Sequence, residues 1–174
     1  MKKDIIIGID PDSRMSGVAR LDVAERKAWA DTLPFPLVIE YVRDVVCRAE
    51  SVGKSVVVVI EKSWNVTTNW HIRLTDSKAV AAKKGYAVGR CHETGCKIVE
   101  MLEHYGIEVH EQLPLRKIWK GKDGKITHEE MTEVCGWSKK RSNGEERDAM
   151  LLAWCASGLP IRVKVKKVNG YEFE

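Results

Sequence analysis

Two short apolar runs, each followed directly by an acidic residue, constrain the fold of this chain more than any other feature. Residues 5–9 read Ile-Ile-Ile-Gly-Ile before Asp10, and residues 56–60 read Val-Val-Val-Val-Ile before Glu61. Continuous apolar runs of this length are typical of strands that are buried on both faces. Residues 38–49 between them have helical spacing, so the two strands are predicted to be parallel.

The rest of the chain continues this alternation, without an internal repeat or a linker, and fits one α/β domain of 174 residues. Residues 62–77 lack periodicity and predict a loop. The other predicted elements are strands at 16–22, 27–33 and 107–111, a mostly helical stretch that ends near Tyr105, a short helix from a Thr127–Glu130 capping box to Cys135, a helix at 145–157 capped by Asn143, and an edge strand at 161–168.

The acids that end the two apolar strands are candidate metal ligands. If the strands are neighbours, Asp10 and Glu61 emerge at the same edge of the sheet, where the sites of open α/β sheets collect. On the last helix, Glu145 and Asp148 are three positions apart and therefore share a face. Clustered carboxylates raise one another's pKa unless a cation lies between them, and oxygen ligands of this kind suit Mg²⁺ or Mn²⁺.

Each acidic position also has a simpler interpretation. Asp10 opens an Asp-Pro-Asp-Ser turn, Glu61 fits a strand-end charge or a surface ion pair, and the helix dipole favours acids in a first turn. Glu146 lies about 200° around the helix from Asp148 and is expected to point towards solvent or the basic residues at 139–141. Replacing either glutamate of this turn by Gln is expected to cost similar, small stability, because both contribute alike to the dipole.

The distribution of charge favours a partner with a phosphate backbone. The net charge is only +4, but basic residues gather in 62–90, 114–125 and 161–168, whereas 91–113 is rich in Glu. A positive face of this kind attracts nucleic acid, although an ordinary solvated surface explains the same pattern.

Aromatic residues in the loop at 62–77 suggest contacts with bases. Trp64 and Trp70 lie near Arg73 in this basic loop, next to the strand that ends at Glu61. We expect these tryptophans to stack on unpaired bases, unless they are anchors in the core. The five cysteines, in a chain without a signal segment or a spanning apolar run, predict free thiols and a cytoplasmic protein that does not enter a membrane.

Three motifs, in order, resemble the RuvC-type resolvases of the ribonuclease H-like superfamily. They are Ile7-Gly8-Ile9-Asp10-Pro11 followed by Ser13 and Gly17, then Val59-Ile60-Glu61, and finally Glu145 through Ala149 ahead of an Ala/Leu-rich helix. The stretch from Gln112-Leu113-Pro114 to Lys117 is similar to the family's basic segment, and 127–135 to its short helix. The resemblance covers roughly residues 4–157.

The resemblance implies a mixed five-stranded sheet with helices on both faces and a nuclease domain at 1–160. Residues 161–174, a basic tail or edge strand, lie outside the part of the chain that resembles the family. The resemblance also implies a homodimer that cuts four-way DNA junctions with Mg²⁺ or Mn²⁺. The implied metal ligands are Asp10, Glu61, Glu145 and Asp148.

The chemistry that follows is hydrolysis of a phosphodiester with two metal ions about 4 Å apart. The ions would hold the scissile phosphate, activate water and stabilise the leaving 3′ oxygen, which gives 5′-phosphate and 3′-hydroxyl ends. Lys117, Lys120 or Lys125 would neutralise the reacting phosphate, and the sequence does not choose among them.

Two positions depart from the family pattern. Asp12 stands where Gly is usual, so a positive φ is expected there, and Glu145 stands where Asp or His is usual. The alternatives are a related nuclease for structured RNA or RNA–DNA hybrid, an actin-like nucleotide-binding domain, and an inactive junction-binding module. The chain is short for two actin-like lobes and its first turn lacks glycines that cradle phosphate, while the three acidic elements argue against an inactive module.

Overall fold

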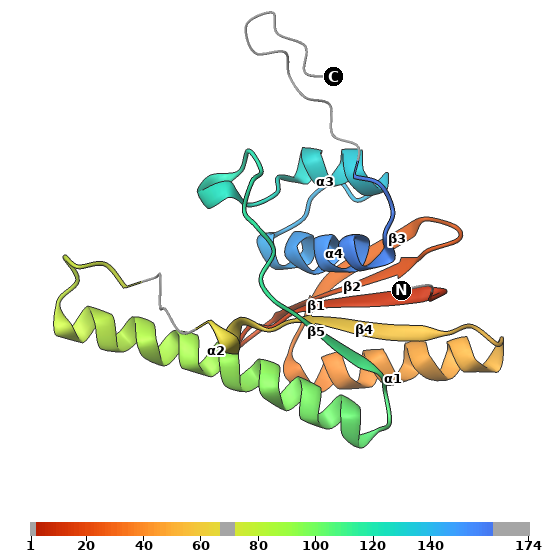
Figure 1. Ribbon diagram of the computed structural model, residues 1–174, viewed down its shortest axis with the longest axis horizontal. Coiled ribbons are helices and arrows are strands. Elements are labelled where there is room, and N and C mark those ends of the chain that lie inside the picture. Colours follow the sequence, from red (N-terminus) through yellow and green to blue (C-terminus); the bar gives the residue numbers. More distant parts are fainter. Residues whose placement is uncertain (1–2, 67–71, 162–174) are drawn as a thin grey trace, which may run out of the picture.

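The computed structural model describes residues 3–66 and 72–161 (Figure 1). Trp70 and most of the edge strand expected at 161–168 lie outside the described residues. The elements are β1 (Ile5–Asp10), β2 (Ser16–Asp22), β3 (Lys27–Leu33), α1 (Phe35–Ser51), β4 (Val56–Glu61), α2 (Lys78–His104), β5 (Val109–Gln112), α3 (His128–Cys135) and α4 (Gly144–Ser157). The predicted elements are all present within the described part of the chain, with β5 beginning two residues later than expected.

The described strands form one mixed sheet of five strands in the order β3-β2-β1-β4-β5. β1 pairs antiparallel with β2, and β2 pairs antiparallel with β3. β1 is parallel to β4, as the two apolar runs predict, and β4 is parallel to β5. This is the ribonuclease H-like sheet that the sequence resemblance implies.

Helices cover both faces of the sheet (Figure 1). Alternate residues of β1 and β4 point to opposite faces, so each strand contributes to the core on both sides. Ile6, Val57 and Val59 belong to the core under α3 and α4. Ile7 and Ile9, with neighbours on β4, belong to the core under α1 and α2. The two central strands are buried on both faces, which explains why their sequences are continuous apolar runs instead of alternating ones.

Two glycines let α4 lie directly on the sheet. A Cβ at Gly8 of β1 would collide with the backbone carbonyl of Ala149, and one at Gly17 of β2 would collide with that of Glu145. Gly17 pairs with Asp10 in the β1–β2 register. The close approach therefore brings the first turn of α4 to the end of β1.

Local signals fix where the last two helices begin and end. Thr127 and Glu130 form the expected capping box of α3. The Asn143 side chain accepts a hydrogen bond from the backbone N–H of Glu146 at the start of α4, and Gly158 ends this helix with a φ of 71°.

All five cysteines are free thiols. Within residues 3–66 and 72–161, no helix is long and apolar enough to cross a membrane.

Candidate metal centre

Three of the four predicted ligands come together where β1 ends and α4 begins. One carboxylate oxygen each from Asp10, Glu145 and Asp148 lies within 4.8 Å of the others, an arrangement able to hold a metal ion. Asp10 is the last residue of β1, and the other two come from the first two turns of α4. The shared helical face of Glu145 and Asp148 therefore faces the sheet edge.

Glu61 lies at the same edge, one strand away. The parallel register pairs Ile9 with Ile60, so the residues that follow, Asp10 and Glu61, leave their strands side by side. Glu61 is outside the group of three oxygens but close enough to act on Asp10 electrostatically. Its role as a metal ligand stays a prediction.

Burial and the neighbouring acids raise the pKa values of Asp10 and Glu61. Burial, followed by the charges of Glu61, Asp148 and Glu145, raises the pKa of Asp10 well above its ordinary value. Burial also raises the pKa of Glu61, with a further contribution from Asp148. Without a cation between them, the carboxylates of this cluster are costly to ionise together.

Two of the three candidate lysines face this cluster. Lys125 Nζ lies 2.6 Å from Asp148 Oδ2. Burial alone would lower the pKa of Lys125, but its hydrogen bond with Asp148 and the nearby acids outweigh burial and raise it. The positive charge of Lys117 lowers the pKa of Glu61 and so offsets part of the rise that burial causes. The exposed Lys120 is fixed through its backbone N–H, which donates to the carboxylate of Glu130.

The donor set fits a hard divalent cation. Glu145 Oε2 is buried and has no hydrogen-bond partner among the residues that the structure describes. A buried, unpaired carboxylate oxygen costs free energy unless something else satisfies it. An ion bound among Asp10, Glu145 and Asp148 would do so with oxygen ligands, the type that Mg²⁺ and Mn²⁺ prefer.

Asp12 does not have the backbone conformation that its place in the motif predicts. Among the described residues other than glycine, only Arg26 and Asp123 have a positive φ, so the expectation for Asp12 was wrong. Instead, Asp12 Oδ1 accepts hydrogen bonds from the backbone N–H groups of Arg14 at 2.8 Å and Met15 at 3.3 Å. The side chain thus closes the turn after β1 without a left-handed residue.

The tryptophan loop is only partly described. Trp64 is half-buried, packs with the core under α1 and α2, and lies so close to α2 that a Cβ at Gly95 would collide with its ring. Arg73 is exposed, and its backbone N–H donates to Asp76 Oδ2 at 2.8 Å. Trp70 lies outside the described residues. Base stacking by this loop stays a prediction.

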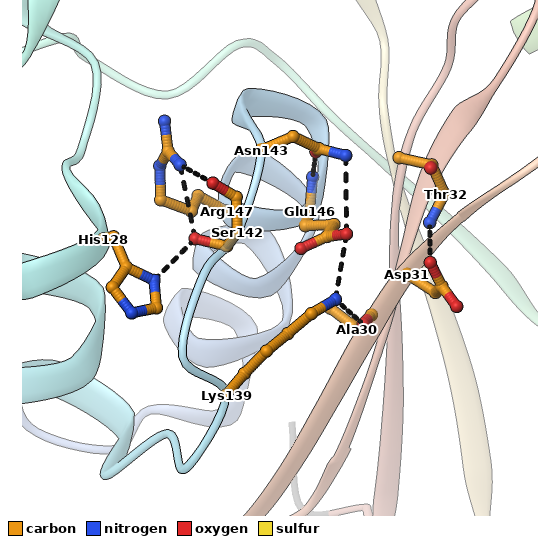
Figure 2. Close-up of polar contacts among 9 residues, drawn as sticks. All are labelled: Ala30, Asp31, Thr32, His128, Lys139, Ser142, Asn143, Glu146 and Arg147. Carbon is orange, nitrogen blue, oxygen red and sulfur yellow. Dashed lines mark hydrogen bonds and ion pairs between the residues drawn. The ribbon is translucent and has the colours of Figure 1, made fainter.

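Two charged neighbours of the ligands on α4 have roles that the sequence did not reveal (Figure 2). Glu146 is 5% exposed, and its Oε1 lies 2.9 Å from Lys139 Nζ. It therefore points towards the basic residues at 139–141, one of the two directions expected, and not towards solvent. Arg147 donates to the backbone carbonyls of Ile126 and Ser142. The partners of Arg147 come from segments that carry no motif, so no sequence pattern points to them.

Comparisons with known proteins find similar chains only among solved structures. No protein-family model and no curated protein matches the chain. Among solved structures, that of Thermus thermophilus RuvC in complex with a Holliday junction substrate covers 86% of this chain and 90% of its own, at 15% identity and a TM-score of 0.48. A second Thermus thermophilus RuvC structure covers 86% and 91%, at 15% identity and a TM-score of 0.49. The ribonuclease H-like assignment itself rests on the strand order and strand directions given above.

Proposed function

We propose that the chain is a metal-dependent endonuclease. The observation that carries the proposal is the convergence of Asp10, Glu145 and Asp148, with Glu61 beside them and a buried oxygen of Glu145 left unpaired. Such a cluster is costly to ionise in the fold unless a cation is bound. A site built from oxygen ligands at the carboxyl ends of parallel strands is a common arrangement for metal-assisted phosphoryl chemistry.

The acids and the lysines of the site would have different roles. Asp10, Glu145 and Asp148 would hold Mg²⁺ or Mn²⁺, two ions when Glu61 also takes part. Bound there, the metal supplies Lewis-acid stabilisation of the phosphate and activates water at neutral pH. Lys125 and Lys117 bring two positive charges to the edge of the cluster, where they would stabilise the negative charge that develops on the phosphate.

The proposed substrate is a four-way DNA junction. The three motifs that resemble RuvC-type resolvases support this substrate. They contain Asp10, Glu145 and Asp148, whose oxygens lie within 4.8 Å of one another, and Glu61 at the end of the neighbouring strand. The basic character of 62–90 and 114–125 suits a partner with a high density of phosphates. We propose that the active form is a homodimer and that each nick leaves 5′-phosphate and 3′-hydroxyl ends.

One substrate panel tests the proposal. A synthetic four-way junction, a linear duplex of the same sequence and an RNA–DNA hybrid are each incubated with the protein and Mn²⁺, Mg²⁺ or a chelator. We expect paired nicks in the junction, little cutting of the duplex, and none with the chelator. Preferred cutting of the hybrid would support the related nuclease for RNA, and cleavage of the junction in excess chelator would contradict metal dependence.

A further inference from the structure

We propose that Arg147 is a positioning residue that holds Lys125 against the acidic cluster. This inference rests on the proposed nuclease function, because Lys125 is the cation that it places. Arg147 does not reach the cluster itself; it acts on the segment that carries Lys125. The argument comes from its hydrogen bonds and from the position of its neighbours along α4.

The guanidinium of Arg147 joins two segments that flank the start of α4, and Figure 2 shows its contacts with the segment at Ser142. Nε donates to the backbone carbonyl of Ile126 at 2.8 Å. Nη1 donates to the backbone carbonyl of Ser142 at 2.6 Å and to the Ser142 hydroxyl at 3.2 Å. That hydroxyl also lies 2.8 Å from His128 Nδ1 at the start of α3. Arg147 therefore fastens both segments to α4.

The contact at Ile126 lies directly beside the contact that Lys125 makes with the site. Lys125 Nζ lies 2.6 Å from Asp148 Oδ2, and Asp148 is the residue after Arg147. Two consecutive residues of the loop thus contact two consecutive residues of α4, whose side chains leave the helix about 100° apart. Contacts in two directions fix the orientation of residues 125 and 126 on the surface of α4, whereas without Arg147 only Lys125 would hold them to this helix by a directed contact.

The hydrogen bonds of the loop set its shape and tie it to α3 through Lys120 N–H and Glu130, but they do not tie it to α4. Trp119 N–H donates to the carbonyl of Gly124, and Gly121 N–H donates to the carbonyl of Lys125, both within the loop. Burial of Ile126 holds the loop to the core, but apolar packing is non-directional. The directed contacts to α4 come from Arg147 and Lys125. The planar guanidinium donates from two nitrogens, Nε and Nη1, in a fixed arrangement, which the single nitrogen of an ammonium does not reproduce.

A double-mutant cycle on the cleavage rate separates this role from a merely structural one. Lys125→Met, Arg147→Met and the double variant are compared with the wild type at saturating Mn²⁺. A small displacement of a catalytic group lowers rates by about 10- to 100-fold, so we expect Arg147→Met to fall in that range with the half-saturating Mn²⁺ concentration unchanged. In the Lys125→Met background, Arg147→Met should cause almost no further loss.

The matched control is Arg141→Met, the same substitution at an exposed arginine on the neighbouring segment. The factor by which Arg141→Met lowers the cleavage rate should be the same whether Lys125 is present or replaced by Met. Arg147→Lys keeps the positive charge and the long stem but has one donor nitrogen where Arg147 uses two, and we expect it to behave as Arg147→Met. Independent losses in the Arg147 cycle, or full activity of Arg147→Lys, would overturn the proposal.

A second readout does not depend on activity, so it separates failure of this inference from failure of the nuclease proposal. Limited acetylation followed by mass spectrometry gives the relative reaction rates of Lys125 and the exposed Lys120. In the wild type, Lys125 should react more slowly, because its ammonium pairs with Asp148. In folded Arg147→Met or Arg147→Lys, Lys125 should approach the rate of Lys120. An unchanged ratio in both variants would show that Arg147 does not position Lys125, whether or not the wild type cuts DNA.

Discussion

Glu145 and Glu146 are adjacent at the start of α4 but contact different partners. Glu145 faces Asp10 and Asp148, and Oε2 of each glutamate is buried without a hydrogen-bond partner among the described residues. Glu146 is ion-paired with Lys139, which also donates to the carbonyl of Ala30 on β3 (Figure 2). The first glutamate is placed for metal binding, and the second attaches the segment before α4 to the helix and to the sheet.

The two glutamates should therefore differ in stability as well as in activity. We expect Glu146→Gln to lower stability by about 1 kcal/mol, because it removes the charge of the buried member of a pair whose Lys139 side chain is 36% exposed, and to keep most of the activity below the melting transition. Glu145→Gln should leave the stability of the metal-free protein unchanged or higher, and lower the cleavage rate at least about 10-fold. Thermal melts and rates against Mn²⁺ concentration check both. If Glu145→Gln and Glu146→Gln lowered the stability equally, as the helix dipole alone implies, this account would be contradicted.

The raised pKa of Asp10 predicts how the stability of the metal-free protein depends on pH. An acid whose pKa is higher in the folded than in the unfolded state contributes stability below its unfolded pKa, and this contribution is lost as pH rises through the folded pKa. In chelator at pH 8, Asp10→Asn should therefore melt at a higher temperature than the wild type. The difference should shrink as the pH falls towards the ordinary pKa of an aspartate. A variant that is less stable at pH 8, or a gap that widens at low pH, would count against the clustered acids.

At the level of elements, the position of α4 depends on the absence of side chains beneath it. Gly17→Ala would place a Cβ against the carbonyl of Glu145. Forced overpacking of this kind costs about 1–3 kcal/mol, and the shift of α4 should also raise the Mn²⁺ concentration needed for cleavage. The measurements are melting temperature and metal dependence of the rate.

The matched control is Gly89→Ala in α2, where an added Cβ has nothing within 4 Å. Alanine in a helix interior is favoured over glycine by about 0.5–1 kcal/mol. We therefore expect the same substitution to stabilise at position 89 and to destabilise at position 17. A Gly17→Ala protein that is as stable and as active as the wild type would mean that α4 does not rest on β2.

Much of the element order was predictable, because its signals are local. The apolar runs, the Thr127 capping box and the Asn143 cap each lie within a few residues of the structure that they determine. Three of the four acids could be grouped because strand ends and helical spacing fix their places. The sequence could not show that Lys125 and Lys117, and not Lys120, act on the acids, nor what Arg147 contacts. These features depend on contacts between residues far apart in the sequence, such as Ile126 and Arg147. No periodicity or short motif encodes such contacts.

For the whole molecule, the proposed substrate demands two active sites. A four-way junction has two strands to be cut at symmetric positions, and a dimer with a two-fold axis places one site at each. We expect the mass of the protein bound to a junction to be that of two chains, measured by light scattering or native mass spectrometry. A single chain per junction, together with a monomer in the free state, would contradict the proposed assembly.

The most direct test of the central claim is cleavage of a synthetic four-way junction by wild-type and Asp10→Asn protein, each with Mn²⁺ and with chelator, alongside a binding measurement on the same junction. Asp10 lies between the other acids, so losing its charge should remove metal binding while leaving the basic surface intact. We predict paired nicks by the wild type only with metal, no cleavage by Asp10→Asn, and junction binding by both. Cleavage by Asp10→Asn at the wild-type rate would contradict the assignment of this cluster as a nuclease centre.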